Sequence, residues 1–216
     1  MHVPDGFFDA PTSVATGVAT AVVIGVSLRK ARGELDDRTA PLVGLVAAFV
    51  FATQMLNFPT GLGPSGHLMG GAIAAVLVGP WTGILCVSVV LIVQALLFAD
   101  GGITALGTNV GLIGVATVVV GWGVFRGLQA VLPKTVAMVP VCAAVGAFVS
   151  VPIASLVFVG LYAVGGAKPD NFSEYFAAGC VGFGLGTYIY TPGMAAETVA
   201  ERARAAVAAY EEGLPK

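Results

Sequence analysis

Charged side chains are scarce in this sequence. Of its 216 residues, 57% are hydrophobic and only 10% are charged, with ten Lys or Arg against twelve Asp or Glu. A soluble domain carries roughly 25% charged residues, so this chain has too few to cover the surface of a soluble globule. The composition excludes an ordinary soluble enzyme and a disordered chain, and the net charge of −2 provides no basic surface for nucleic acid. It predicts an all-α, polytopic membrane protein.

Cysteine and histidine are also rare. The three cysteines, Cys86, Cys142 and Cys180, fall inside apolar runs and are expected to be buried as small hydrophobic side chains. Their odd number and wide spacing argue against a disulfide or zinc framework. Residues 1–28 contain no Lys or Arg, so we expect no cleavable signal peptide. His2 and His67 are the only histidines in the sequence.

Seven apolar stretches are candidates for membrane-spanning helices, each of which needs about 20 residues to cross a bilayer. They cover residues 12–28, 41–56, 66–80, 81–98, 109–125, 136–164 and 175–192. Several are short and rich in glycine, which is tolerated where a helix packs against protein. Pro140 and Pro152 predict a kink in the sixth. The chain then divides into an N-terminal segment (1–11), a helical bundle (12–194) and a tail (195–216) that forms either a solvated helix end or a docking surface.

The distribution of Lys and Arg predicts the orientation of the bundle. With seven helices, nine of the ten basic residues share one side of the membrane and only Lys168 lies on the other. Because basic residues concentrate on the cytoplasmic side, the N-terminus is predicted outside a cell membrane and the tail in the cytoplasm. The nine are Arg29, Lys30, Arg32, Arg38, Arg126, Lys134, Arg202, Arg204 and Lys216. Both histidines are then predicted at the outer face.

His2 is placed where it can form a chelate with the end of the chain. The Met1 amine, the His2 amide nitrogen and the His2 imidazole Nδ1 can bind one metal ion through adjacent chelate rings. His67 would complete a square-planar set of four nitrogens, a geometry typical of Cu(II) or Ni(II). The N-terminal residues can equally be an ordinary lead-in to the first helix, and the sequence pattern leaves both interpretations open.

Three polar residues are candidates to support such a metal site near the outer face. Ser65 lies two residues before His67, while Gln94 and Asn109 are polar groups at membrane depth that need internal partners. The alternative role for Gln94 and Asn109 is interhelical hydrogen bonding.

Three stretches, MHVPDGF, PSGHLMGGAIAAVLVGPWTG and QALLFADGGITALGTNVGLIGV, resemble the CbiM/NikM family in sequence and in order. Members are substrate-specific membrane components of energy-coupling-factor transporters for cobalt and nickel. The resemblance runs in register from Met1 to about Gly166. It implies a seven-helix protein, without a cofactor, that captures Co(II) or Ni(II) outside through the Met1 amine, the His2 amide and imidazole, and the His67 imidazole. Residues 175–216 depart from the family pattern.

The same resemblance implies that partner subunits hydrolyse ATP. A transmembrane coupling subunit and cytoplasmic ATPases would drive transport, with a small accessory membrane subunit often present. The chain itself has no G-x-x-x-x-G-K-[ST] loop. The expectation is therefore a transport component that is not an enzyme.

Two other functions agree less well with the sequence. A self-sufficient secondary transporter usually shows internal repeats and intramembrane carboxylates, and neither is visible here. A metal-dependent membrane hydrolase is disfavoured because H-E-x-x-H is missing and the nearest outer acids, Asp5, Asp9 and Asp100, are distant from His67 in sequence. The residues do not decide between cobalt and nickel.

Overall fold

The computed structural model describes residues 2–8, 10–36, 39–59, 65–164, 168–177, 185–190 and 193–213. Within this part the regular secondary structure is helical apart from one short antiparallel pair, β1 (Phe58–Pro59) with β2 (Ser65–Gly66). Four helical stretches of the described part are long and apolar enough to cross a membrane, namely Ala10–Gly33, Pro80–Leu97, Leu106–Val131 and Met138–Leu161. The predicted all-α, multi-pass membrane protein is therefore confirmed.

The first two predicted spans form as expected. They are α1 (Ala10–Lys30), extended by the 3-10 turn η1 (Ala31–Gly33), and α2 (Thr39–Gln54). One face of α1 leaves Val14, Val18, Val22 and Val26 exposed at i, i+4 spacing. A row of exposed valines suits a lipid environment rather than water, because lipid tails solvate apolar side chains.

The third predicted span is shorter than the sequence suggested. Helix α3 covers only Gly71–Val78, because Gly70 has a φ of +82° and a right-handed helix cannot continue back through it to His67. A Cβ at Gly70 would lie 2.6 Å from Val50 Cγ1, so glycine also allows the backbone to approach α2. His67 therefore lies on a non-helical segment that leads into α3.

Helix α4 (Pro80–Leu97) follows α3 after a single residue, Gly79, whose φ is +92°. The amide groups at the start of α4 are satisfied by a side chain from another part of the chain. Glu34 accepts hydrogen bonds from the Thr82 N–H at 2.7 Å and the Trp81 N–H at 3.3 Å. Glu34 thus fastens the α1–α2 connection to the α3–α4 turn.

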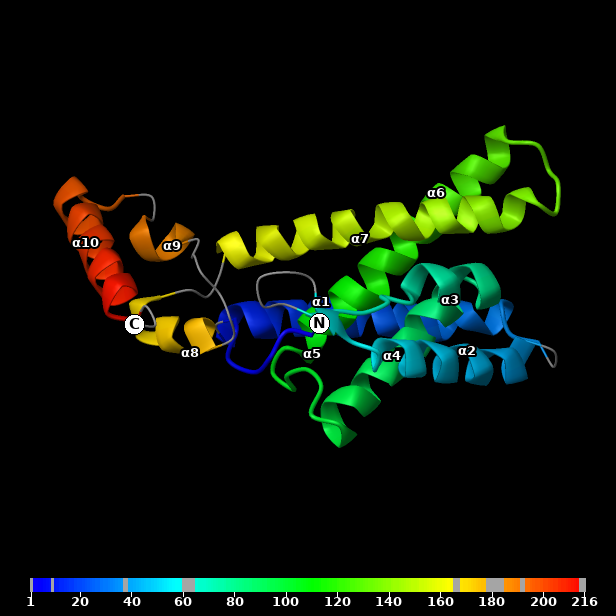
Figure 1. The fold of residues 1–216 in the computed structure, drawn as a ribbon, viewed down its shortest axis with the longest axis horizontal. Helices are drawn as coiled ribbons and strands as arrows, with labels where there is room; N and C mark the ends of the chain where they lie inside the picture. Colours follow the sequence, from blue (N-terminus) through cyan, green and yellow to red (C-terminus); the bar gives the residue numbers. More distant parts are fainter. Residues whose placement is uncertain are drawn as a thin grey trace.

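In the structure, the fifth and sixth predicted spans form helical stretches of 26 and 27 residues. Helix α5 (Leu106–Asn109), the π-helical segment η2 (Val110–Ala116) and α6 (Thr117–Val131) follow one another without a break. Helix α7 (Met138–Val164) continues through Pro152 and packs against α6 (Figure 1). The main core lies between α2, α3, α4 and η2, around Val50, Val87 and Leu91. Cys86 and Cys142 are buried and free, as predicted, whereas Cys180 lies outside the described residues.

The region after α7 differs from the predicted seventh span. Its described parts form η3 (Pro169–Asn171), α8 (Phe172–Ala177), α9 (Gly186–Ile189) and α10 (Ala196–Gly213). Residues 178–184, 191 and 192 of the expected 175–192 helix lie outside the described residues.

The tail helix α10 packs on α8, and Phe7 of the N-terminal segment contacts the same cluster of Phe172 and Ala206. Figure 1 shows α8, α9 and α10 beyond the start of α1 and the end of α7. The tail thus lies at the end of the bundle that carries the N-terminal segment, whereas the charge pattern predicts opposite sides. The physical reason is that the described residues contain no long helix between α7 and α10 to carry the chain back across. The seven-helix count and the orientation of the termini stay predictions.

Candidate metal centre

The N-terminal segment is bound inside the bundle along the connection between α4 and α5. The Val3 N–H donates to Asn109 Oδ1 at 2.8 Å, and Asn109 Nδ2 donates back to the Val3 carbonyl at 3.0 Å. The same carbonyl accepts the Gly102 N–H at 2.8 Å. Asn109, predicted to support the site or to join helices, therefore positions the residue that follows His2.

A second anchor lies at Asp5. Its Oδ1 accepts both the backbone N–H and the hydroxyl of Thr104, each at 2.7 Å. These hydrogen bonds lower the pKa of the Asp5 carboxyl, since they favour its charged form. A Cβ at Gly102 would overlap the backbone nitrogen of Asp5, so only glycine permits the segment to lie this close.

His2 is deeply buried and paired with a carboxylate. Its Nδ1 lies 2.8 Å from Asp100 Oδ1, and the His2 side chain is 1% exposed while that of Asp100 is 31% exposed. Burial lowers the pKa of His2 below 6.5 despite the opposing effect of Asp100. The ring is therefore held neutral, with Nδ1–H donating to Asp100 and the lone pair on Nε2.

The ring of His67 stacks on that of His2, with centroids 4.8 Å apart and an interplanar angle of 25°. His67 Nδ1 lies 2.9 Å from the Leu68 carbonyl oxygen, which accepts its proton and leaves the lone pair on Nε2. Both Nε2 atoms are buried, and neither has a hydrogen-bond partner within the described part of the chain. Two residues that are 65 positions apart thus bring two unpaired imidazole nitrogens to one place.

Two glutamines, one on α2 and one on α4, are buried. Gln94, one of the predicted supporting residues, is fully buried, and among the described residues neither polar atom of its amide has a partner. Gln54 donates from Nε2 to the Met69 carbonyl at 2.8 Å, two residues after His67. Gln54 was not among the predicted residues, although a glutamine near the end of an apolar helix is a visible signal in the sequence.

The remaining predicted site residues are only partly described. Met1 lies outside the described residues, and for Ser65 the structure gives the backbone of β2 but not the side chain. Among the residues described, no group of three or more His, Cys, Asp or Glu side chains is placed to hold a metal ion. Asp100 and Thr104 are contacts that sequence reasoning missed, because a loop pairing with the chain terminus leaves no periodic pattern.

Comparison with known proteins extends this description. The family described as the cobalt uptake substrate-specific transmembrane region matches residues 2–203. A putative metal transport protein of Haloquadratum walsbyi is 49% identical over 58% of this chain and 58% of its own length. A putative fused nickel transport protein NikMN of Archaeoglobus fulgidus is 44% identical over 60% of this chain and 43% of its own length. A cobalt transport protein CbiM of Geobacter sulfurreducens is 35% identical over 60% of this chain and 38% of its own length.

Two solved structures have a fold similar to that of this chain. The crystal structure of a truncated transition metal transporter superposes with a TM-score of 0.67 at 31% identity, over 76% of each chain. A second transition metal transporter gives a TM-score of 0.66 at 26% identity, over 97% of this chain and 84% of the other. The matched region covers about half the length of the curated relatives named above. With the family match extending over nearly the whole chain, the protein belongs to the CbiM family of cobalt uptake substrate-specific transmembrane regions.

Proposed function

We propose that this chain captures Co(II) or Ni(II) at the outer face of the cell membrane as the substrate-binding component of a transporter. The ligands are the Met1 amine, the His2 amide nitrogen and imidazole, and the His67 imidazole. The stacking of His2 on His67, which brings the two imidazoles together and leaves the buried Nε2 of His67 unpaired, is the observation that carries this proposal. Imidazole is a preferred ligand of both metals, and the names of the relatives specify cobalt or nickel.

Metal capture requires a change of partner at His2. A chelate through the His2 amide uses Nδ1 of the same residue, and that nitrogen donates to Asp100 in the structure. The incoming ion therefore displaces Asp100 from Nδ1, and the ligand nitrogen gives up its proton. In this scheme Asp100 is a positioning residue that holds the ring in place until the ion arrives.

The geometry supports binding because the N-terminal segment is already ordered in the described residues. Val3 and Asp5, which follow the chelating residues in the chain, are fixed by Asn109 and Thr104. Such preorganisation reduces the entropy that would otherwise be lost when the chain end wraps around the ion.

Energy for transport is proposed to come from partners. A transmembrane coupling subunit and cytoplasmic ATPase subunits would move the loaded chain, with an additional small membrane subunit. The fused NikMN relatives support the idea that a component of this kind operates together with further segments. The coupling subunits would act on the bundle and not on the metal ligands.

Calorimetric titration with Co(II) and Ni(II), run side by side, tests the proposal. Protein with a free N-terminus and a C-terminal tag should bind one ion, and a protein with one extra residue before Met1 should lose binding, since His2 is then no longer second. His67→Ala should weaken the affinity by about a hundredfold or more, the scale of one lost coordinating nitrogen plus its positioning. Native affinity in the N-terminally extended protein would overturn the chelate.

A further inference from the structure

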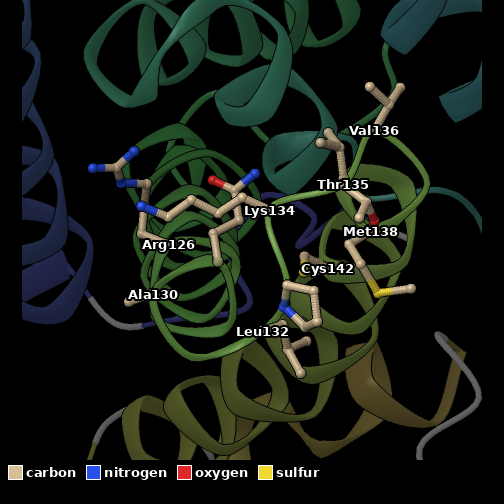
Figure 2. Close-up of a pocket in the computed structure, with 11 residues that line it drawn as sticks. Arg126, Ala130, Leu132, Lys134, Thr135, Val136, Met138 and Cys142 are labelled. Carbon is tan, nitrogen blue, oxygen red and sulfur yellow. The ribbon is translucent and has the colours of Figure 1, made fainter.

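A pocket far from the two histidines lies where α6 ends and α7 begins. Its volume is about 560 Å³, which is within the usual range of roughly 300–1,000 Å³ for small-molecule sites. Eleven residues line it, and they come from the last turns of α6, the connection and the first turns of α7. Figure 2 shows Arg126 and Lys134 extending to the same side of this pocket.

The charge of the pocket has one sign. Arg126 and Lys134 are its charged lining residues, and the lining contains no carboxylate, although acidic residues outnumber basic ones in the whole chain. Neither cation forms a salt bridge with another described residue. The Arg126 guanidinium lies 5.7 Å from the ring centre of Trp122, one turn earlier on α6. This contact orients the guanidinium while its N–H groups remain available to an acceptor.

Apart from Gln129 and Thr135, the rest of the lining is apolar. Leu132, Val136 and Met138 line the pocket next to the two cations, and Val136 is 90% exposed. Val131, at the end of α6, is 79% exposed. An exposed apolar surface beside a pair of cations matches a molecule that has an anionic head and an apolar tail.

The predicted position of this pocket in the membrane also fits a molecule with an anionic head and an apolar tail. The connection carrying Lys134 falls on the side that the Lys and Arg distribution predicts to be cytoplasmic, and Trp122 is a residue type that concentrates at membrane interfaces. The cytoplasmic leaflet carries anionic lipids, and basic pockets between transmembrane helices on that side bind their headgroups.

We propose that the α6–α7 pocket binds the headgroup phosphate of an anionic phospholipid. Arg126 and Lys134 hold the phosphate, and the acyl chains run along the exposed apolar residues at the start of α7. This site is independent of the metal ligands and needs no assumption about the transported ion.

The test uses the full chain in vesicles of phosphatidylcholine containing a minority of phosphatidylglycerol, followed by native mass spectrometry of retained lipid. The unaltered protein should retain phosphatidylglycerol over phosphatidylcholine. Arg126→Gln and Lys134→Gln should each weaken retention about fivefold, the effect of roughly one interfacial basic residue. The double variant should lose the preference for the anionic lipid.

Two controls separate the pocket from general charge. Arg29→Gln with Arg32→Gln removes the same charge on the same predicted side but outside the pocket lining, and should leave retention unchanged. Ala130→Phe fills the pocket while keeping both cations, and should reduce retention.

Two results would overturn the proposal. They are an equal loss of lipid retention in the Arg29/Arg32 pair, or unchanged lipid retention in the Arg126/Lys134 pair. If that second pair also lost assembly with the coupling subunit, the pocket would be a protein contact.

Discussion

The imidazole of His2 and the carboxylate of Asp100 are joined by a hydrogen bond of 2.8 Å between Nδ1 and Oδ1. The two residues are 98 positions apart, and the bond holds a nearly fully buried ring at the mouth of the bundle. The nitrogen that pairs with Asp100 is also the one that the proposed chelate requires. Asp100 and the metal ion therefore compete for one atom.

Replacement of Asp100 by Ala should loosen the N-terminal segment in the metal-free protein but not in the loaded one. A hydrogen bond to a charged group contributes about 1.5–3 kcal/mol, and only the metal-free state uses it. Hydrogen exchange at the Val3 amide should speed up roughly tenfold or more without metal and stay unchanged with it. Thr104→Val is the matched control, since its contact with Asp5 is expected to persist in both states. Equal loosening in both states of Asp100→Ala would contradict an exchange of partners at Nδ1.

Gly102→Ala should prevent the N-terminal segment from packing against the connection between α4 and α5. The added Cβ would overlap the backbone of Pro4 and Asp5, and backbone cannot move aside as a flexible side chain can. Overpacking of this kind costs about 1–3 kcal/mol, so metal affinity measured by calorimetry should fall about fivefold or more. Gly127→Ala on α6, where nothing lies within 4 Å of the new Cβ, should bind metal normally. Native affinity in Gly102→Ala would show that the docked segment is not needed.

Glu34→Ala should lower the thermal stability of the bundle while leaving metal affinity intact. Its carboxylate accepts two N–H groups at the start of α4 and also faces the positive end of that helix. Loss of such a cap costs about 0.5–2 kcal/mol, which should appear as a lower midpoint in a thermal unfolding assay. Glu201→Ala on α10 serves as the control, because Glu201 is exposed. An unchanged midpoint in Glu34→Ala would show that the cap is replaced by water.

The pKa of His2 sets a pH dependence with a definite sign. Burial lowers this pKa from 6.5, so the docked segment favours the neutral ring. Docking of the metal-free segment should be constant above pH 6.5, weaken as the pH falls from 6.5 to the lowered pKa, and level off below it. An NMR titration of the imidazole protons, assigned with the His67→Ala variant, checks this. A midpoint above 6.5 would mean that Asp100 outweighs burial.

Much of the fold was visible in the pattern of apolar residues. Helices α1, α2 and α4 begin and end within two residues of the predicted stretches. The prediction for 66–80 was wrong over residues 66–70, because Gly70 adopts a φ that a right-handed helix does not allow and α3 begins only after it. Apolar periodicity does not report a single left-handed residue, and so it extended the helix back through His67.

The tail shows a different limit. Apolar content alone predicted a helix at 175–192, while the described residues there form two short helices that pack with α10. Whether such a segment crosses a membrane or folds on its surface depends on the neighbours that cover it. The sequence does not specify those neighbours in advance.

The sequence by itself determined that this is a membrane protein, where most of its long helices lie, and that His2 and His67 are its candidate metal ligands. Composition and periodicity suffice for those conclusions because they are local properties of the chain. Only the tertiary structure decided that the two rings stack, that Asp100 holds His2, and that Asn109 and Thr104 fix the terminal segment. These contacts join residues about 65 to 106 positions apart, and such pairings depend on how the helices pack in three dimensions.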